Sequence, residues 1–575
     1  MTDATQSLQA TLATSGWWLH PPFVLILGAM LLPLLKGVAQ QVYRVLLALV
    51  FMGLLFQMVA GTYGQFSFLG LDLTTGRADK LSMVFGYVFG LITVIATIYS
   101  LHVKDVVQHI AGFVYAASAV GVVFAGDLIS LYVFWELMML ASVWLIWRRA
   151  TATAYASGYR YLLVHAVSGV LLLGGIVLFF SETGSIAFDQ IPTDSAAFHL
   201  ILIGFLINAA VPPLHAWLTD AYPESTVTGA IFLSAFTTKT AVYTLIRGYP
   251  GTEFLIWLGT IMALWGVVYA LLANDIRRLL AYSIISQVGY MVAGVGMGTA
   301  IALNGAMAHA FAHILYGSVL FMGAGAVMHM TGRSKLSELG GIYKHMPITF
   351  VLYMIGGFAI SAFPLTSGFV TKTMVIEAAA IDHRAWVWLL LSMASVGTFL
   401  YAGLKLPFLT FLGKDSGLRP KDPPWNMLLA MAISAFFCIF IGVAPAWLYQ
   451  FLPAPVDYNA YSLGHIFWES QVLLFTGLGF FIMIKHLGGE AKASVDTDWL
   501  YRKLGPDLVR QTSMLVRGVW SDFIAACLGL LRSAWAGLGQ THGGRGILGR
   551  AWTIGETSVW VVLLLALYGL VYLTL

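Results

Sequence analysis

The chain has 575 residues, of which 59% are hydrophobic and 10% are charged. Soluble domains carry about 25% charged residues, so this composition excludes an ordinary soluble globule and predicts a polytopic membrane protein. The formal net charge of +4 is too small for a nucleic-acid footprint. We therefore expect membrane lipids as neighbours and no nucleic-acid partner.

About sixteen apolar stretches are long enough to cross a bilayer, which requires roughly 20 residues. Only short loops join them, so we expect no soluble domain. No basic segment precedes the first stretch, so the sequence predicts a retained first helix and no cleaved signal peptide. In chain order, the stretches are 20–37, 41–61, 80–100, 108–126, 127–148, 158–180, 198–221, 225–248, 253–273, 277–297, 301–330, 348–380, 386–412, 427–449, 468–486 and 555–574.

The basic residues predict the orientation of these spans, because cytoplasmic loops collect Lys and Arg. With both termini outside a cell (inner) membrane, 23 of the 30 Lys and Arg fall in inner segments and four in outer loops. The remaining three are Lys239, Lys372 and Lys405, which lie within apolar stretches. A charge at the bilayer centre costs about 2.5 to 3.5 kcal/mol on translocon scales, so these lysines indicate a proton or cation path.

Two of the predicted spans contain helix breakers at membrane depth. Pro212 and Pro213 interrupt the first, and the segment 364–368 interrupts the second. A broken helix exposes backbone groups that lipid cannot satisfy, so such breaks face protein or a water-filled cavity, as in transporter ion sites. A merely structural kink is the alternative, but Lys372 follows the second break directly.

Buried lysines and histidines suit proton storage and relay. Burial favours the neutral amine and a nearby carboxylate favours the ammonium, so Lys239 can change its protonation state as a partner approaches or leaves. Glu136 is a candidate partner, although it could instead hold two helices together by a hydrogen bond. His309 and His313 are four residues apart and share one helix face, which suits a relay between lysines. Structural hydrogen bonds are the alternative for both histidines.

Three further polar residues lie near the expected path. Lys405 lies near a helix end, where a lysine can either serve the path or reach the interface as an anchor. His165 and His215 lie near the expected cavity and are treated as secondary candidates.

Metal and redox chemistry are not expected within this chain. Cys438 and Cys527 show no CxxC or Cys/His spacing, which argues against disulfides, iron–sulfur clusters and structural zinc. The HxxxH pair lacks an evident third ligand. We expect no cofactor and no metal.

Six sequence blocks carry a family resemblance. They lie in consistent order between about residues 105 and 412, as DLISLYVFWELMMLASVW, PLHAWLTDAYPES, FTTKTAVYTLIR, ANDIRRLLAYSIISQVGYM, HAFAHILYGSVLFMGAGAV and PLTSGFVTK. Together they resemble the proton-translocating antiporter-like proteins. That family includes the D subunit of multisubunit Mrp sodium/proton antiporters and the large membrane-arm subunits of NADH:quinone oxidoreductase and related hydrogenases. DAYPES and GLKLPFLTFLG are most similar to the D-type subunit.

The resemblance implies roles for five residues. Glu136 would be the fifth-helix glutamate that acts on a nearby lysine and on neighbouring subunits, and Lys239 the eighth-helix lysine. Lys372 would be the charged residue at the second break. His309 and His313 would connect the two halves of the proton path.

Two positions depart from the family pattern. Many relatives carry lysines where this chain has Asn208 and Gly317. Asparagine can hydrogen-bond a water wire but cannot carry a proton as a charge. Either Lys239 substitutes for the missing lysine, or the subunit moves ions by a reduced route or with altered stoichiometry.

The resemblance also implies a domain order. Transmembrane helices 1–107 would precede a core at 108–412, built from two inverted five-helix repeats at 108–248 and 253–412 that each contain one broken helix. Helices within 413–497 would follow. Regular arginines among Leu, Val, Trp and Phe predict an amphipathic interfacial helix at 498–552, before an anchor helix at 553–575. The interfacial helix at 498–552 would clamp neighbouring subunits, or simply lie on the membrane.

The expected fold is an all-α polytopic membrane protein of about 14 to 16 transmembrane helices. The expected function is that of an ion-translocating subunit of a multisubunit cation/proton antiporter, with H+ and Na+ as the ions and other subunits as partners. The alternative is a proton-pumping or supporting subunit of a respiratory or hydrogenase complex, or of an inorganic-carbon uptake system. Only in a redox complex would the chain belong to an enzyme, as a translocase.

Overall fold

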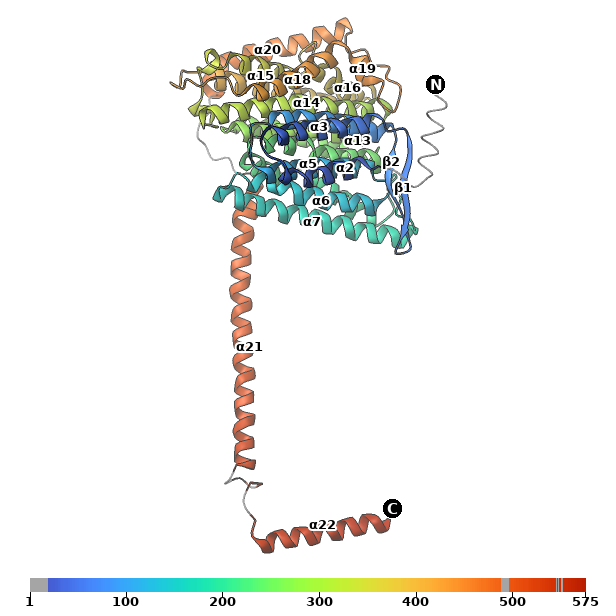
Figure 1. Cartoon of the computed structure of the whole chain (residues 1–575), viewed down its shortest axis with the longest axis vertical. Helices are drawn as coiled ribbons and strands as arrows, with labels where there is room; N and C mark the ends of the chain where they lie inside the picture. Colours follow the sequence, from blue (N-terminus) through green and yellow to red (C-terminus); the bar gives the residue numbers. More distant parts are fainter. Residues whose placement is uncertain (1–18, 488–495, 544–545, 547, 550–551, 575) are drawn as a thin grey trace. The chain divides into compact units, whose positions relative to one another are not determined.

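The computed structural model describes residues 19–487, 496–543, 546, 548–549 and 552–574. Residues 1–18, and with them the prediction about a signal peptide, lie outside the described residues. The chain divides into two compact units, Met1–Thr497 and Asp498–Leu575. The first unit contains the helical body (Figure 1).

The first half of this body contains the elements up to the first predicted repeat boundary. They are α2 (Pro21–Met30), η1 (Leu32–Leu34), α3 (Gly37–Phe56), β1 (Gly61–Phe68), β2 (Leu71–Ala78), α4 (Lys80–Tyr99), α5 (Val106–Phe124), α6 (Leu128–Trp147), α7 (Ala152–Thr183), α8 (Ala197–Asn208), α9 (Ala216–Ala221), η2 (Tyr222–Glu224), α10 (Gly229–Ala235) and α11 (Thr237–Gly248).

The second half of the body continues to the end of the first unit. Its elements are α12 (Glu253–Leu272), α13 (Ile276–Met297), α14 (Ala300–Thr331), η3 (Leu336–Glu338), η4 (Ile342–Lys344), α15 (Pro347–Ile360), α16 (Ser367–Ile381), α17 (Ala385–Thr398), the π-helical segments η5 (Phe399–Lys405) and η6 (Phe408–Leu412), α18 (Trp425–Val443), α19 (Pro445–Tyr449) and α20 (Leu463–Leu487).

Among the described residues, 14 helices are long and apolar enough to cross a membrane. Thirteen of them coincide with predicted spans, and the other is Leu500–His542. The predicted spans at 20–37, 198–221 and 348–380 contain shorter apolar helices, because each is interrupted. The mostly helical, polytopic fold is therefore confirmed.

Both predicted helix breaks are present and share one backbone feature. α8 ends at Asn208 and α15 ends at Ile360. Two residues beyond these ends, Ala210 and Ala362 adopt left-handed conformations with φ of 58° and 57°. This conformation is costly for a residue with a Cβ atom, so the packing around each break holds it in place. A third interruption, at Phe236 between α10 and α11, was not predicted.

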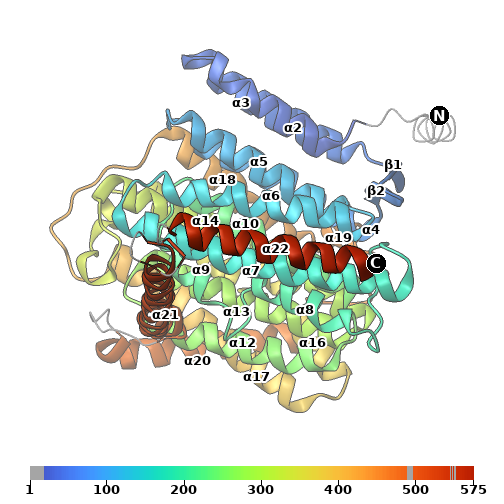
Figure 2. The same ribbon diagram turned by 90° about the horizontal axis from the view of Figure 1, so that it is seen from below.

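Two helices at the centre of the unit are almost wholly enclosed by protein. The apolar windows of α13 and α14 are 100% and 94% buried, so neither helix faces lipid along most of its length. Figure 2 shows α2 and α3 at one edge of the unit and α12 and α17 near the opposite edge. His309 and His313 of α14 are thus shielded from lipid.

A β-hairpin that the sequence analysis did not predict occupies one of the predicted outer loops. β1 pairs with β2 in antiparallel register, from Gly61 opposite Ala78 to Phe68 opposite Leu71. The Thr74 backbone N–H donates to the Asp127 carboxylate at 2.7 Å, and the same carboxylate accepts from Ser130 at the start of α6. The hairpin is thereby held against the helix that carries Glu136.

The second unit contains two helices, α21 (Gly505–His542) and α22 (Ile554–Thr574). A π-helical turn, η7 (Leu500–Leu504), precedes α21. None of the residues described in either helix is buried within the unit. The assignment of 498–552 to the membrane interface stays a prediction, as do the boundaries of the predicted repeats.

Candidate functional site

Two of the intramembrane lysines donate to carbonyl groups at interrupted helices. The Lys239 side chain is fully buried at the start of α11, and its Nζ donates to the Ser234 carbonyl in the last turn of α10 at 2.7 Å. The Lys372 Nζ donates to the carbonyl of Ile360, the last residue of α15, at 3.0 Å. Each break therefore supplies a polar partner to a buried amine.

Lys405 has a similar backbone environment at a different helix end. Its Nζ donates to the carbonyls of Leu271 at 2.5 Å and Ala273 at 3.2 Å, which lie at the C-terminus of α12. The side chain is only 2% exposed, so it is enclosed by protein. These contacts give Lys405 a clear structural role.

The two histidines of α14 lie between Lys239 and Lys372. His309 interacts electrostatically with both lysines, whereas His313 interacts with Lys239 and with His309. The two imidazole rings are 6.3 Å apart, and both are buried. Neither Nδ1 atom has a hydrogen-bond partner among the described residues. The structure thus brings four predicted residues into one axis, in the order Lys239, His313, His309 and Lys372.

Hydroxyl and amide groups flank this axis at His309. The Tyr316 hydroxyl lies 3.4 Å from His309 Nε2 and 3.4 Å from Gln287 Oε1. A single hydroxyl proton can be donated to only one of these acceptors at a time. Gln287 in turn donates to the Thr398 hydroxyl at 3.2 Å. Rotation of the tyrosine hydroxyl can therefore change the hydrogen bonding of His309 without moving a helix.

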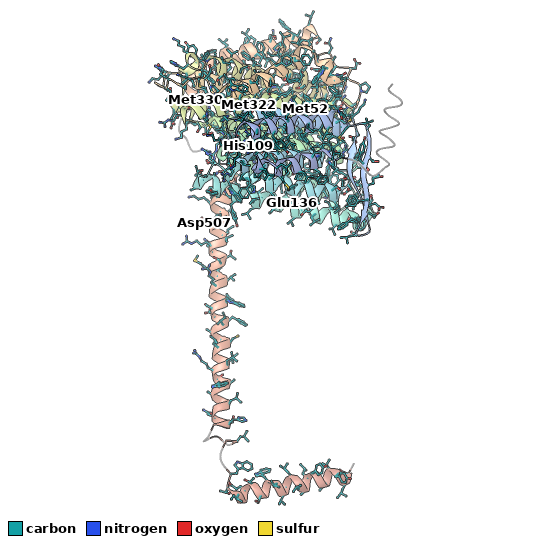
Figure 3. The ribbon with its side chains drawn as sticks, in the orientation of Figure 1. Met52, His109, Glu136, Met322, Met330 and Asp507 are labelled. Atoms are coloured by element: carbon teal, nitrogen blue, oxygen red, sulfur yellow. The ribbon has the colours of Figure 1, made fainter. Side chains whose placement is uncertain are left out.

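Glu136 is not paired directly with Lys239. It lies on α6, within the helical body where Figure 3 labels it, and its Oε1 atom is buried without a hydrogen bond to any described residue. The carboxyl group packs against Gly169 of α7 so closely that a Cβ atom there would lie 1.9 Å from Oε1. In this conformation the Glu136 and Lys239 side chains are therefore not in direct contact, so the expected action of Glu136 on Lys239 has to be indirect.

His165 lies beside Asn208, where the family resemblance implies a lysine in many relatives. Its Nδ1 lies 2.9 Å from the Asn208 side-chain oxygen, and its buried Nε2 has no partner among the described residues. His165 and Gly169 are one turn apart on α7, so the histidine and the Glu136 carboxyl belong to the same face of that helix. A residue treated as secondary in the sequence thus lies between Glu136 and Asn208.

Tyrosine hydroxyls extend from His165 towards Lys239. The Tyr161 ring lies 4.2 Å from the His165 ring, and the Tyr161 hydroxyl is 2.8 Å from that of Ser142. Beyond it, the Tyr115 hydroxyl is 2.6 Å from that of Thr237, two residues before Lys239. These buried hydroxyls form a polar connection across the first half of the core.

Glu469 is a buried acidic residue that the sequence analysis missed. It lies on α20, is 8% exposed, and interacts electrostatically with Lys372. The sequence feature that could have identified Glu469 is a carboxylate within the apolar run HIFWESQVLLF, near the start of a predicted span.

A second missed carboxylate lies at the first helix break. Asp496 is 3.1 Å from the Nε2 atom of His215 and accepts from the Tyr282 hydroxyl at 2.6 Å. Burial would raise the pKa of the Asp496 carboxyl, but the hydrogen bonds from His215 and Tyr282 hold it below its usual range. Asp496 and His215 are 281 residues apart in the sequence, so sequence reasoning could not predict their contact.

Two further predictions concern Gly317 and metal binding. A Cβ atom on Gly317 would lie 3.6 Å from the His313 ring, so the glycine leaves a narrow space beside that histidine. Within the described part of the chain, no three His, Cys, Asp or Glu residues are grouped as metal ligands.

The fold and the buried axis define a multi-pass membrane protein of the antiporter-like class. The chain belongs to the family described as "NADH:quinone oxidoreductase/Mrp antiporter, TM", whose model matches residues 125–400. It is 30% identical over 360 residues to F(420)H(2) dehydrogenase subunit M of Methanosarcina mazei, a match covering 57% of this chain and 72% of that protein. It is 28% identical over 425 residues to hydrogenase-4 component B of Escherichia coli, covering 66% of this chain but only 63% of that relative.

Solved structures show the same fold at low sequence identity. A chain of the archaeal membrane-bound sulfane sulfur reductase matches with a TM-score of 0.70 and 20% identity, covering 96% of this chain and 99% of that one. A chain of the Mrp complex from Dietzia sp. DQ12-45-1b matches with a TM-score of 0.64 and 19% identity, covering 81% and 96% respectively. The expected antiporter-like fold is confirmed by these matches.

Proposed function

We propose that this chain translocates protons as a membrane subunit of a multisubunit monovalent cation/proton antiporter, with Na+ as the exchanged cation. The observation that carries the proposal is the buried axis of Lys239, His313, His309 and Lys372. Amines and imidazoles in such an interior take up and release protons as neighbouring charges change. The family description names Mrp antiporters together with NADH:quinone oxidoreductase, and a proton-translocating subunit agrees with both names.

The proposed path has an inner and an outer part. Glu136, His165 and the tyrosine hydroxyls lie in the first half of the core, and Lys239 joins them to the histidines of α14. Lys372 passes the proton on at the second helix break. Lys405, which binds the end of α12, is retained as a candidate with a structural alternative.

A second candidate function is a proton-translocating subunit of a respiratory or hydrogenase complex. It is favoured by the relatives with redox names and by the sulfane sulfur reductase chain, whose match extends over 96% of this chain. The Mrp-complex match covers 81%. Both candidate functions use the same proton axis. In the antiporter, proton movement is coupled to cation exchange, and in the respiratory or hydrogenase complex it is coupled to electron transfer.

Everted membrane vesicles that contain the assembled complex test the proposal. Addition of Na+ should dissipate an imposed pH gradient in the parent, and Lys239→Ala should abolish this response with normal assembly. Lys239→Arg should also fail, because a guanidinium does not release its proton. Parent-like exchange in the alanine variant would contradict the axis. A proton flux that requires an electron donor, and is indifferent to Na+, would favour the second candidate.

A further inference from the structure

The environment of Lys372 contains a carboxylate on an element outside the predicted antiporter core. Glu469 lies on α20 and is only 8% exposed. Lys372 and Glu469 act on each other electrostatically without forming a direct ion pair among the described contacts. A buried carboxylate is costly unless it is paired with a charge or protonated, so its position near a buried amine requires a reason.

Contacts between α16 and the start of α20 fix this arrangement. The Phe369 ring of α16 lies 4.9 Å from the His465 ring of α20. The hydroxyl of Thr373, which follows Lys372, is 2.8 Å from that of Tyr458 in the segment before α20. His465 and Glu469 are one helical turn apart, with Nε2 and Oε1 separated by 4.0 Å. The carboxylate therefore lies in a packed, defined neighbourhood.

His465 connects this neighbourhood to the surface. It lies in the first turn of α20, its side chain is 18% exposed, and its Nδ1 is 2.6 Å from the Ala460 carbonyl. The orientation predicted from basic residues places this end of α20 outside. The order Lys372, Glu469 and His465 thus runs from a fully buried amine to a partly exposed imidazole.

We propose that Glu469 is the carboxylate partner of Lys372 and that Glu469 and His465 form the outward end of the proton path. The inference rests on the proposed function. The Lys372 ammonium gives its proton to the Glu469 carboxylate, leaving a neutral amine and a carboxylic acid. The acid then protonates His465, which releases the proton to outer water, so Glu469 and His465 return to their starting states. A proton from His309 restores the Lys372 ammonium and completes the cycle.

Other ionisable groups face this cluster and must be considered in any pH dependence. Tyr290 of α13 has its ring 5.8 Å from the Lys372 amine, and His309 of α14 interacts with the same lysine. Tyr458 interacts electrostatically with both Glu469 and Glu377, and Glu377 is an exposed carboxylate at the outer part of α16. Glu377 therefore offers a matched control for the loss of one negative charge.

The test compares Glu469→Gln with Glu377→Gln in the complete complex, with transport measured against pH. Glu469→Gln should lower transport at least tenfold at the parent's optimum. It should also move the alkaline limb of the pH profile to lower pH, because the ammonium loses its counter-charge. Glu377→Gln should behave as the parent. A Glu469→Gln complex within twofold of the parent, with an unchanged pH profile, would overturn the assignment.

Two further variants keep the test decisive. If Glu469→Gln does not assemble, Glu469→Asp, which keeps a shorter carboxylate, should show a shifted pH profile; a parent profile would overturn the proposal. In a Lys372→Met background, residual transport should show no additional pH shift from Glu469→Gln.

If Lys239→Ala and Lys372→Met both transport normally, the proposed function itself fails. If they are inactive while Glu469→Gln is normal, only the role of Glu469 fails.

Discussion

Gly169 provides a direct test of whether the position of the Glu136 carboxyl matters. In Gly169→Ala, the new Cβ atom would lie 1.9 Å from Glu136 Oε1 and 2.8 Å from its carboxyl carbon. Ordinary carbon–oxygen contact begins near 3.4 Å, so the carboxyl has to move by about 1.5 Å. Misplacement of a reacting group by about 1 Å can cost on the order of 100-fold in rate. We expect proton transport to fall between 10- and 100-fold.

The fold should survive this substitution. Alanine is favoured over glycine inside a helix by about 1 kcal/mol, and local overpacking costs about 1 to 3 kcal/mol. The net loss of stability should therefore not exceed about 2 kcal/mol. Gly174 of the same helix is a matched control, because a Cβ atom there meets nothing within 4 Å.

The assay is proton flux in vesicles at equal complex content, together with thermal unfolding of the purified complex. Gly174→Ala should transport as the parent does. Transport by Gly169→Ala within twofold of Gly174→Ala would refute the view that the Glu136 carboxyl needs its present position.

Two other predictions concern Asn208 and Lys405. Asn208→Lys should fold, because His165 and the nearby Glu136 offer polar partners, and it should alter the pH dependence of transport. Aggregation of this variant, with a control substitution well folded, would show that the pocket tolerates no charge. Lys405→Met should lower the free energy of unfolding by about 1 to 3 kcal/mol, because the Leu271 and Ala273 carbonyls lose their donor. Thermal unfolding measures this loss. Transport per assembled complex should stay near the parent value. Loss of transport at unchanged stability would instead place Lys405 in the path.

The sequence predicted the features that have strong local signals. The breaks at Pro212 and at 364–368 were visible as prolines and glycines, and the lysines were visible as charges in apolar runs. The interruption at Phe236 was not, because FLSAFTTKT contains no proline or glycine and tertiary packing decides it. The hairpin at 61–78 was not predicted either, because its two eight-residue strands lie between two predicted spans and are too short to span a membrane as helices.

The composition of the candidate site could be predicted better than its contacts. His309 and His313 share a helix face by spacing alone, and in the structure they interact electrostatically with Lys239 and, for His309, with Lys372. The gap between Glu136 and Lys239 depends on how α6, α7 and α11 pack, which spacing does not report. The interaction of Glu469 with Lys372 and the contact of Asp496 with His215 join residues about 100 and 280 positions apart in the chain.

Lysines 239, 372 and 405 share one feature: each amine binds carbonyl oxygens at the C-terminal end of a helix. Such an end carries roughly half an elementary negative charge. The helix ends thus replace part of the hydration shell that an ammonium would have in water, and they do so without adding a formal negative charge to the membrane interior. Making α15 and α16 continuous would engage the Ile360 carbonyl in the helix, and would thus remove the polar group to which the Lys372 amine donates.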